Sequence, residues 1–143
     1  MYNIIISTVL ASLLSLTINA QDGRHHYEQI DSNGTELSEL MKALKDKPDE
    51  EASHYNLAIH YYNKGVYIIE NMDYEQDFET LFEIQAQVMD LFGAALPYML
   101  KAYKLNPLRK ETLVGLSGIY FGLNNIEESE KYQAELKKLE NQE

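Results

Sequence analysis

The sequence predicts an all-α protein of about five helices, and two observations support this class. Apolar residues recur three and four positions apart from Asp77 to Pro107, which is the period of one face of a helix. A constant spacing between similar residues predicts, in addition, a helical unit that occurs twice. Pairs of this kind are 59 residues apart: Pro48 and Pro107, His54 and Leu113, and Tyr61 and Tyr120.

Residues 1–20 have the pattern of a signal peptide. They carry no charged side chain, hold an apolar run from Ile4 to Ile18 that is diluted by five Ser and Thr residues, and end in the small residue Ala20. The run is shorter than the roughly 20 apolar residues that a membrane span needs. We expect cleavage after Ala20, a mature chain that begins at Gln21 without a membrane span, and export in soluble form to the periplasm or out of the cell. Because no Lys or Arg follows Met1, an uncleaved anchor and a buried N-terminal helix stay open as alternatives.

The composition narrows the classes of function. The chain has 143 residues, enough for one domain, and a formal net charge of −11. A strongly acidic surface repels phosphate groups, so neither nucleic acid nor an anionic membrane is expected as a partner. Cysteine is absent, which excludes disulfides, thiolate metal sites and a cysteine nucleophile.

Residues 21–34 are polar and have no sustained period, which predicts a flexible leader. His25 and His26 lie in this leader and are too few to make a metal site, so we interpret them as part of an exposed tail. The helical domain is expected over residues 35–140. Thr35 is the predicted N-cap of its first helix, and Pro48 prevents that helix from continuing.

Three segments have the residue spacing of a known repeat family. Residues 54–67 and 113–120 match the first helix of its unit, and residues 95–107 match the second. The matching positions are His54, Leu57, Ala58, Tyr61, Gly65 and Tyr67; Leu113, Leu116, Ser117 and Tyr120; Ala95, Met99, Ala102 and Pro107. From Thr35 to Leu139 the chain resembles the tetratricopeptide repeat (TPR) proteins. The resemblance implies a short solenoid of antiparallel helix pairs with an expanded first repeat, in the style of small exported bacterial proteins.

The expansion predicts a protruding hairpin. A unit of this family has about 34 residues, so about 25 residues are extra between Tyr67 and Ala94. The simplest use of them lengthens two helices, joined near residues 71–76. Gly65 would then lie inside a helix, at a cost of about 1 kcal/mol. We expect the burial of four apolar side chains against each other to offset this cost: Ile69, Met72, Phe78 and Leu81.

After Pro107 the pattern predicts one ordinary repeat, whose last helix runs from Glu127 to Leu139. Ser129 and Gln133 replace apolar residues of the family, which suits a terminal helix that faces solvent. A row of glycines, Gly115, Gly118 and Gly122, favours close packing of helices rather than ligand binding.

No combination of residues predicts catalysis, a cofactor or a metal ion. His54 and His60 are six positions apart, so they lie on different faces of one helix, and we interpret both as structural. Paired acidic residues such as Glu127 and Glu128 are interpreted as solvated charge. We therefore expect a protein that is not an enzyme.

In the TPR family the first helices of successive repeats line a concave groove that holds a peptide. By this resemblance the groove here would be lined from two helices: Tyr55, Ile59, Tyr62 and Asn63 from one, and Val114, Gly118 and Phe121 from the other. These side chains are mostly aromatic and aliphatic, so a clamp for a terminal carboxylate is not expected. The helix over residues 35–46, or the inserted hairpin, is the alternative occupant of the groove.

The predicted function is a non-catalytic scaffold or assembly factor that binds a protein or peptide partner. The alternative is a structural protein whose repeats associate with further copies of the chain into a homo-oligomer. The groove is the expected binding surface. The acidic tip of the hairpin, residues 71–77, is the alternative binding surface.

Overall fold

A computed structural model describes residues 34–142 of the chain, and every regular element within that range is an α-helix. The five helices are α2 (Thr35–Asp46), α3 (Glu51–Asn71), α4 (Phe78–Leu105), α5 (Lys110–Gly122) and α6 (Ile126–Glu140). This confirms the all-α class and the predicted helix number. The predicted signal peptide and almost all of the predicted leader, including His25 and His26, lie outside the described residues.

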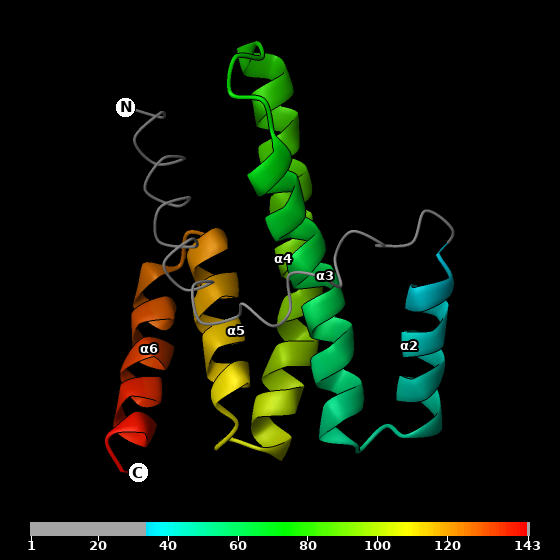
Figure 1. The fold of residues 1–143 in the computed structure, drawn as a ribbon, viewed down its shortest axis with the longest axis vertical. Helices are drawn as coiled ribbons and strands as arrows, with labels where there is room; N and C mark the ends of the chain where they lie inside the picture. The colour runs from blue at the N-terminus through cyan, green and yellow to red at the C-terminus, as the bar shows by residue number, and fades with distance from the viewer. Residues whose placement is uncertain (1–33, 143) are drawn as a thin grey trace.

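Each helix packs against the next one along the chain, and α3 also contacts α5 (Figure 1). The α3–α4 pair forms a long hairpin whose upper half extends beyond α2, α5 and α6 (Figure 1). Its two helices have 21 and 28 residues, joined by residues 72–77. The predicted lengthening of both helices is therefore confirmed.

Capping residues define two of the helix starts. Asp77 is the N-cap of α4, where its carboxylate accepts the backbone N–H of Thr80 at 3.0 Å. This hydrogen bond lowers the pKa of Asp77, because it favours the charged carboxylate. The prediction of Thr35 as the N-cap of α2 is wrong. Gly34 caps that helix with a left-handed backbone (φ 67°), which costs glycine little, and Thr35 is already helical.

The centre of the core is Phe92 of α4, which has 0% exposed surface. Its ring stacks on Tyr62 of α3 with centroids 5.4 Å apart. A Cβ at Gly65 of α3 would lie 2.6 Å from ring atom Cε1, and a Cβ at Gly122 of α5 would also overlap the ring. Gly65 is therefore explained by packing, because only a residue without a side chain leaves room for Phe92 between three helices.

The glycine row of α5 likewise leaves room for large side chains of neighbouring helices. A Cβ at Gly115 would lie 2.5 Å from Cε of Met99, and one at Gly118 would overlap the hydroxyl end of Tyr62. Each glycine of the row thus receives a large side chain from α3 or α4. This confirms the prediction that the row permits close packing of helices.

Helix α6 is buried along one side and exposed along the other. Tyr132 is buried and Leu136 and Leu139 are half-buried, as predicted. Ser129 is 1% exposed, and its hydroxyl donates to the backbone oxygen of Ser117 at 2.9 Å. The hydroxyl oxygens of the two serines are 3.2 Å apart. Ser129 therefore lies on the buried side of this terminal helix, where Ser117 of α5 satisfies its hydroxyl.

The hairpin buries fewer of its apolar side chains than the sequence predicted. Ile69 is buried and Met72 and Leu81 are half-buried, but Phe78 is 71% exposed. The prediction that Phe78 packs into this cluster is wrong. Its α4 register turns it away from the half-buried row at Leu81 and Ile84, so the side chain points to solvent.

We predict that Gly122→Ala lowers the free energy of unfolding by about 1–3 kcal/mol, because the added methyl would overlap the enclosed Phe92 ring. The matched control is Gly93→Ala, where a Cβ has no neighbour within 4 Å. That change should stabilise the helix by about 0.5–1 kcal/mol. Urea unfolding measures both, and equal effects of the two substitutions would contradict the proposed role of Phe92.

Candidate functional site

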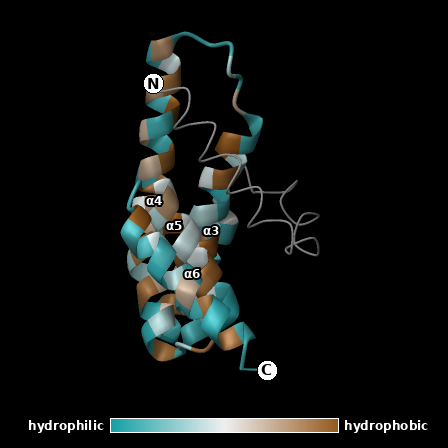
Figure 2. Cartoon of the chain, turned by 90° about the vertical axis from the view of Figure 1, so that its left-hand side faces the viewer, coloured by the Kyte–Doolittle hydropathy of each residue, from teal (hydrophilic) through white to brown (hydrophobic). Residues whose placement is uncertain are grey.

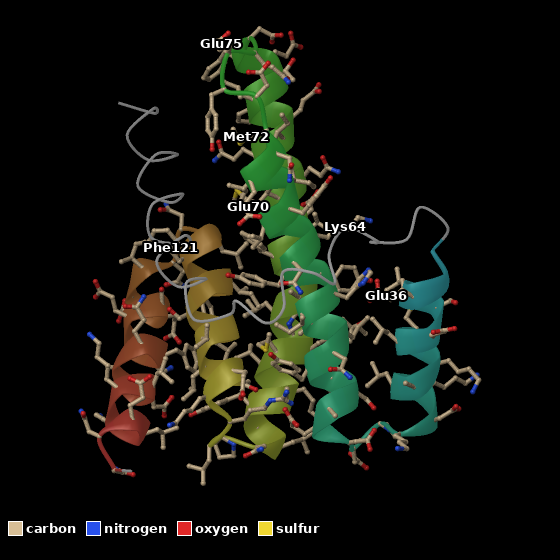
Figure 3. The ribbon with its side chains drawn as sticks, viewed as in Figure 1. Glu36, Lys64, Glu70, Met72, Glu75 and Phe121 are labelled. Carbon is tan, nitrogen blue, oxygen red and sulfur yellow. The ribbon has the colours of Figure 1, made fainter. Side chains whose placement is uncertain are left out.

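The residues predicted to bind a partner lie on two neighbouring helices. We call these seven residues the α3–α5 face: Tyr55, Ile59, Tyr62, Asn63, Val114, Gly118 and Phe121. Gly118 is buried and the other six are half-buried. Phe121 lies near the upper end of α5 (Figure 3). The direct contact between α3 and α5 therefore brings together side chains that are about 60 positions apart in the sequence.

The middle of the α3–α5 face is closely packed. Tyr62 stacks on Phe92 and covers Gly118, whose missing side chain makes room for the tyrosine hydroxyl. Gly118 contributes to this face by admitting Tyr62 rather than through a surface of its own. Tyr62 consequently supports the core as well as the face, so a substitution there would affect both.

Arg109 fixes one end of the face. Its guanidinium carbon lies 3.6 Å from the ring centroid of Tyr55, which is cation–π geometry. Its Nη1 also donates to both carboxylate oxygens of Glu51, at 2.9 and 3.0 Å. The sequence analysis missed this group. Arg109 and Glu51 are 58 positions apart, and no local pattern pairs an arginine with a distant carboxylate.

Helix α2 lies on the other side of α3. The carboxylate of Glu36 is 3.2 Å from Nδ1 of His60, whose side chain is 9% exposed. Figure 1 shows α2 at the edge of the row away from α5, and the hairpin extends past the end of α5. Helices α3 and α5 contact each other directly, with α2 on the opposite side of α3 (Figure 1).

Two hydrogen bonds of polar side chains near the core join neighbouring segments. Nε2 of His54 lies 2.7 Å from the backbone oxygen of Pro48, and since that oxygen only accepts, the ring nitrogen donates. The Tyr103 hydroxyl donates to Glu135 at 2.9 Å, joining α4 to α6. Burial, with a further contribution from Glu135, raises the pKa of Tyr103. These bonds connect neighbouring segments and do not form a relay toward an open site.

Among residues 34–142, no cluster of three or more histidine and carboxylate side chains has the geometry to hold a metal ion. Over the same residues, no helix is both long and apolar enough to span a bilayer.

Comparison of the chain with family models, curated proteins and solved structures found no match. The TPR resemblance consequently rests on the repeated residues themselves and stays a prediction.

We predict that Arg109→Lys lowers the free energy of unfolding by about 1–2 kcal/mol. Lysine keeps the charge but loses the planar guanidinium, which lies flat on Tyr55 and whose Nη1 reaches both carboxylate oxygens of Glu51. Thermal unfolding tests this, with Lys42→Ala as the control because it removes only the exposed pair with Asp46. A loss no larger than that of the control would show that Arg109 does not anchor this end of the face.

Proposed function

We propose that this protein is a non-catalytic interaction scaffold of the TPR type, exported from the cytoplasm, which binds a protein or peptide on the α3–α5 face. The observation that carries the proposal is the gathering of half-buried aromatic and aliphatic side chains on two adjoining helices. Partly exposed aromatic residues held in a packed surface are the usual anchors of protein binding.

The contacts behind the face support binding with little rearrangement. Tyr62 is held between Phe92 and Gly118, and Tyr55 is held beneath Arg109. Side chains that are already ordered lose less conformational entropy when a partner binds, so more of the contact energy appears as affinity. The residues of the face are also uncharged, which favours a partner segment with apolar or aromatic side chains.

We predict that a photo-crosslinking amino acid at position 121 or 59 captures a partner protein in the native host. The same group at Ile126, an exposed apolar position on α6, should give no such adduct. Mass spectrometry of the adducts identifies the partner. Phe121→Ala should then weaken its binding about tenfold, whereas Ile126→Ala should not. Equal capture from 121 and 126 would contradict a binding site on the α3–α5 face.

Export is the second part of the proposal, and it depends on the uncharged apolar run of residues 1–20. We predict that the protein recovered from the native host begins at Gln21, as measured by intact mass and N-terminal sequencing. Recovery of a soluble chain that still begins at Met1 would contradict it.

A further inference from the structure

One continuous seam of side chains runs the length of α4. Positions alternate four and three residues apart, which is the a/d spacing of a helix that packs along another helix. The seam consists of Phe78, Phe82, Gln85, Met89, Phe92, Leu96, Met99 and Tyr103. All but Gln85 are apolar or aromatic, so the seam has the chemistry of a helix–helix interface throughout. Figure 2 shows hydrophobic segments recurring along α4 up to its upper end.

The lower half of the seam is already an interface. Phe92 packs against Gly122 of α5, and Met99 packs against Gly115. Further down, Tyr103 meets the ring of Tyr132 and the carboxylate of Glu135, both on α6. Helices α5 and α6 thus cover this side of α4 as far as Phe92.

The upper half of the seam has the same spacing but is exposed. Helix α5 ends at Gly122, at the level of Phe92. Above that level, Phe78, Phe82 and Met89 are 71%, 62% and 39% exposed. From Phe78 to Met89 they extend over 12 residues of α4, or about 16 Å at a rise of about 1.5 Å per residue. Exposed apolar patches of this kind mark interaction sites, because leaving them in water is unfavourable.

The charge of the hairpin selects the type of partner. Between Gly65 and Leu100 the sequence contains seven acidic residues and no Lys, Arg or His. The seven are Glu70, Asp73, Glu75, Asp77, Glu79, Glu83 and Asp90. Glu79, Glu83 and Asp90 are spaced four and seven apart, so they form one row of carboxylates beside the seam. Figure 3 shows Glu70 and Glu75 at successive heights toward the hairpin tip.

We propose that the upper seam of α4 is a docking surface for a basic amphipathic helix of another protein. The partner helix would place apolar residues on Phe78, Phe82 and Met89, continuing the interface that α5 makes lower on the same seam. Its flanking Lys and Arg side chains would face the carboxylate row, as charged positions beside a coiled-coil seam do. This surface shares no residue with the α3–α5 face, and the inference does not depend on the function proposed for that face.

The same charges oppose a second copy of the chain as the occupant. Two hairpins docked on each other would bring together fourteen carboxylates, seven from each copy, with no basic residue in either segment. Like charges across an interface are unfavourable and suppress such pairing, whereas opposite charges raise the association rate. An anionic lipid surface is disfavoured for the same reason.

The test uses the purified full chain and a synthetic amphipathic peptide, with Leu at its a and d positions and Lys at the flanking positions, labelled for fluorescence anisotropy. The control peptide has Glu in place of every Lys. We expect the Lys peptide to bind at least about tenfold more tightly than the Glu peptide, with affinity that falls as salt rises. Absence of binding, or equal binding of both peptides, would overturn the proposal.

Substitutions then map the bound peptide to the seam. The double variant Phe78→Ser, Phe82→Ser should weaken binding about tenfold or more. Both side chains are mostly exposed, so its helicity and melting temperature should match those of the parent. The matched control is Leu108→Ser, Ile126→Ser, which removes two exposed apolar side chains away from the seam and should leave affinity within about twofold.

Two results would place the interaction elsewhere. Equal weakening by the seam variant and the control variant would show that the peptide binds by general hydrophobic attraction. A parent chain that sediments as a dimer, and becomes monomeric only in the seam variant, would show that the occupant is a second copy.

Discussion

The packing of Phe92 is the contact on which the arrangement of three helices depends. Its ring is enclosed, and two of the helices around it contribute a glycine at the point of contact, Gly65 from α3 and Gly122 from α5. Each glycine inside a helix is unfavourable by about 1 kcal/mol relative to alanine, and full burial of a phenylalanine side chain, at about 1.5–3 kcal/mol, is large enough to offset the two glycines. The crossing of α3, α4 and α5 is therefore set by one large side chain and the space left for it.

Polar contacts join neighbouring helices in addition to the apolar packing. Ser117 and Ser129 satisfy each other between α5 and α6, and Arg109 joins the start of α5 to Glu51 at the start of α3. These bonds are directional, so they set the register of neighbouring helices more narrowly than apolar contact alone. Arg109 also holds Tyr55 in place on the α3–α5 face. Stability and the proposed binding surface consequently depend on shared residues.

Two surfaces of different chemistry result from this framework. The α3–α5 face is uncharged, half-buried and supported by the core. The upper seam of α4 is largely exposed, beside a row of carboxylates, on a hairpin that extends past the other helices (Figure 1). Salt should weaken binding at the second surface far more than at the first, because exposed charges are screened within about 8 Å at physiological ionic strength. The lengthening of α3 and α4 is what creates the second surface.

The sequence by itself predicted the class and the approximate number of helices, because apolar periodicity and proline positions are local signals, and it predicted the lengthened hairpin through its resemblance to a repeat unit of known length. It also predicted the glycine row as a packing feature. It did not determine which apolar side chains are buried. Phe78 and Leu81 both fit the pattern of a helix face, yet only the position of the neighbouring helices leaves Phe78 exposed. Likewise, serine is a polar residue that is common at the surface, yet Ser129 is buried, because Ser117 on another helix accepts its hydrogen bond. Pairing of Arg109 with Glu51 across 58 positions depends on where two helix ends meet, which only the tertiary structure decides.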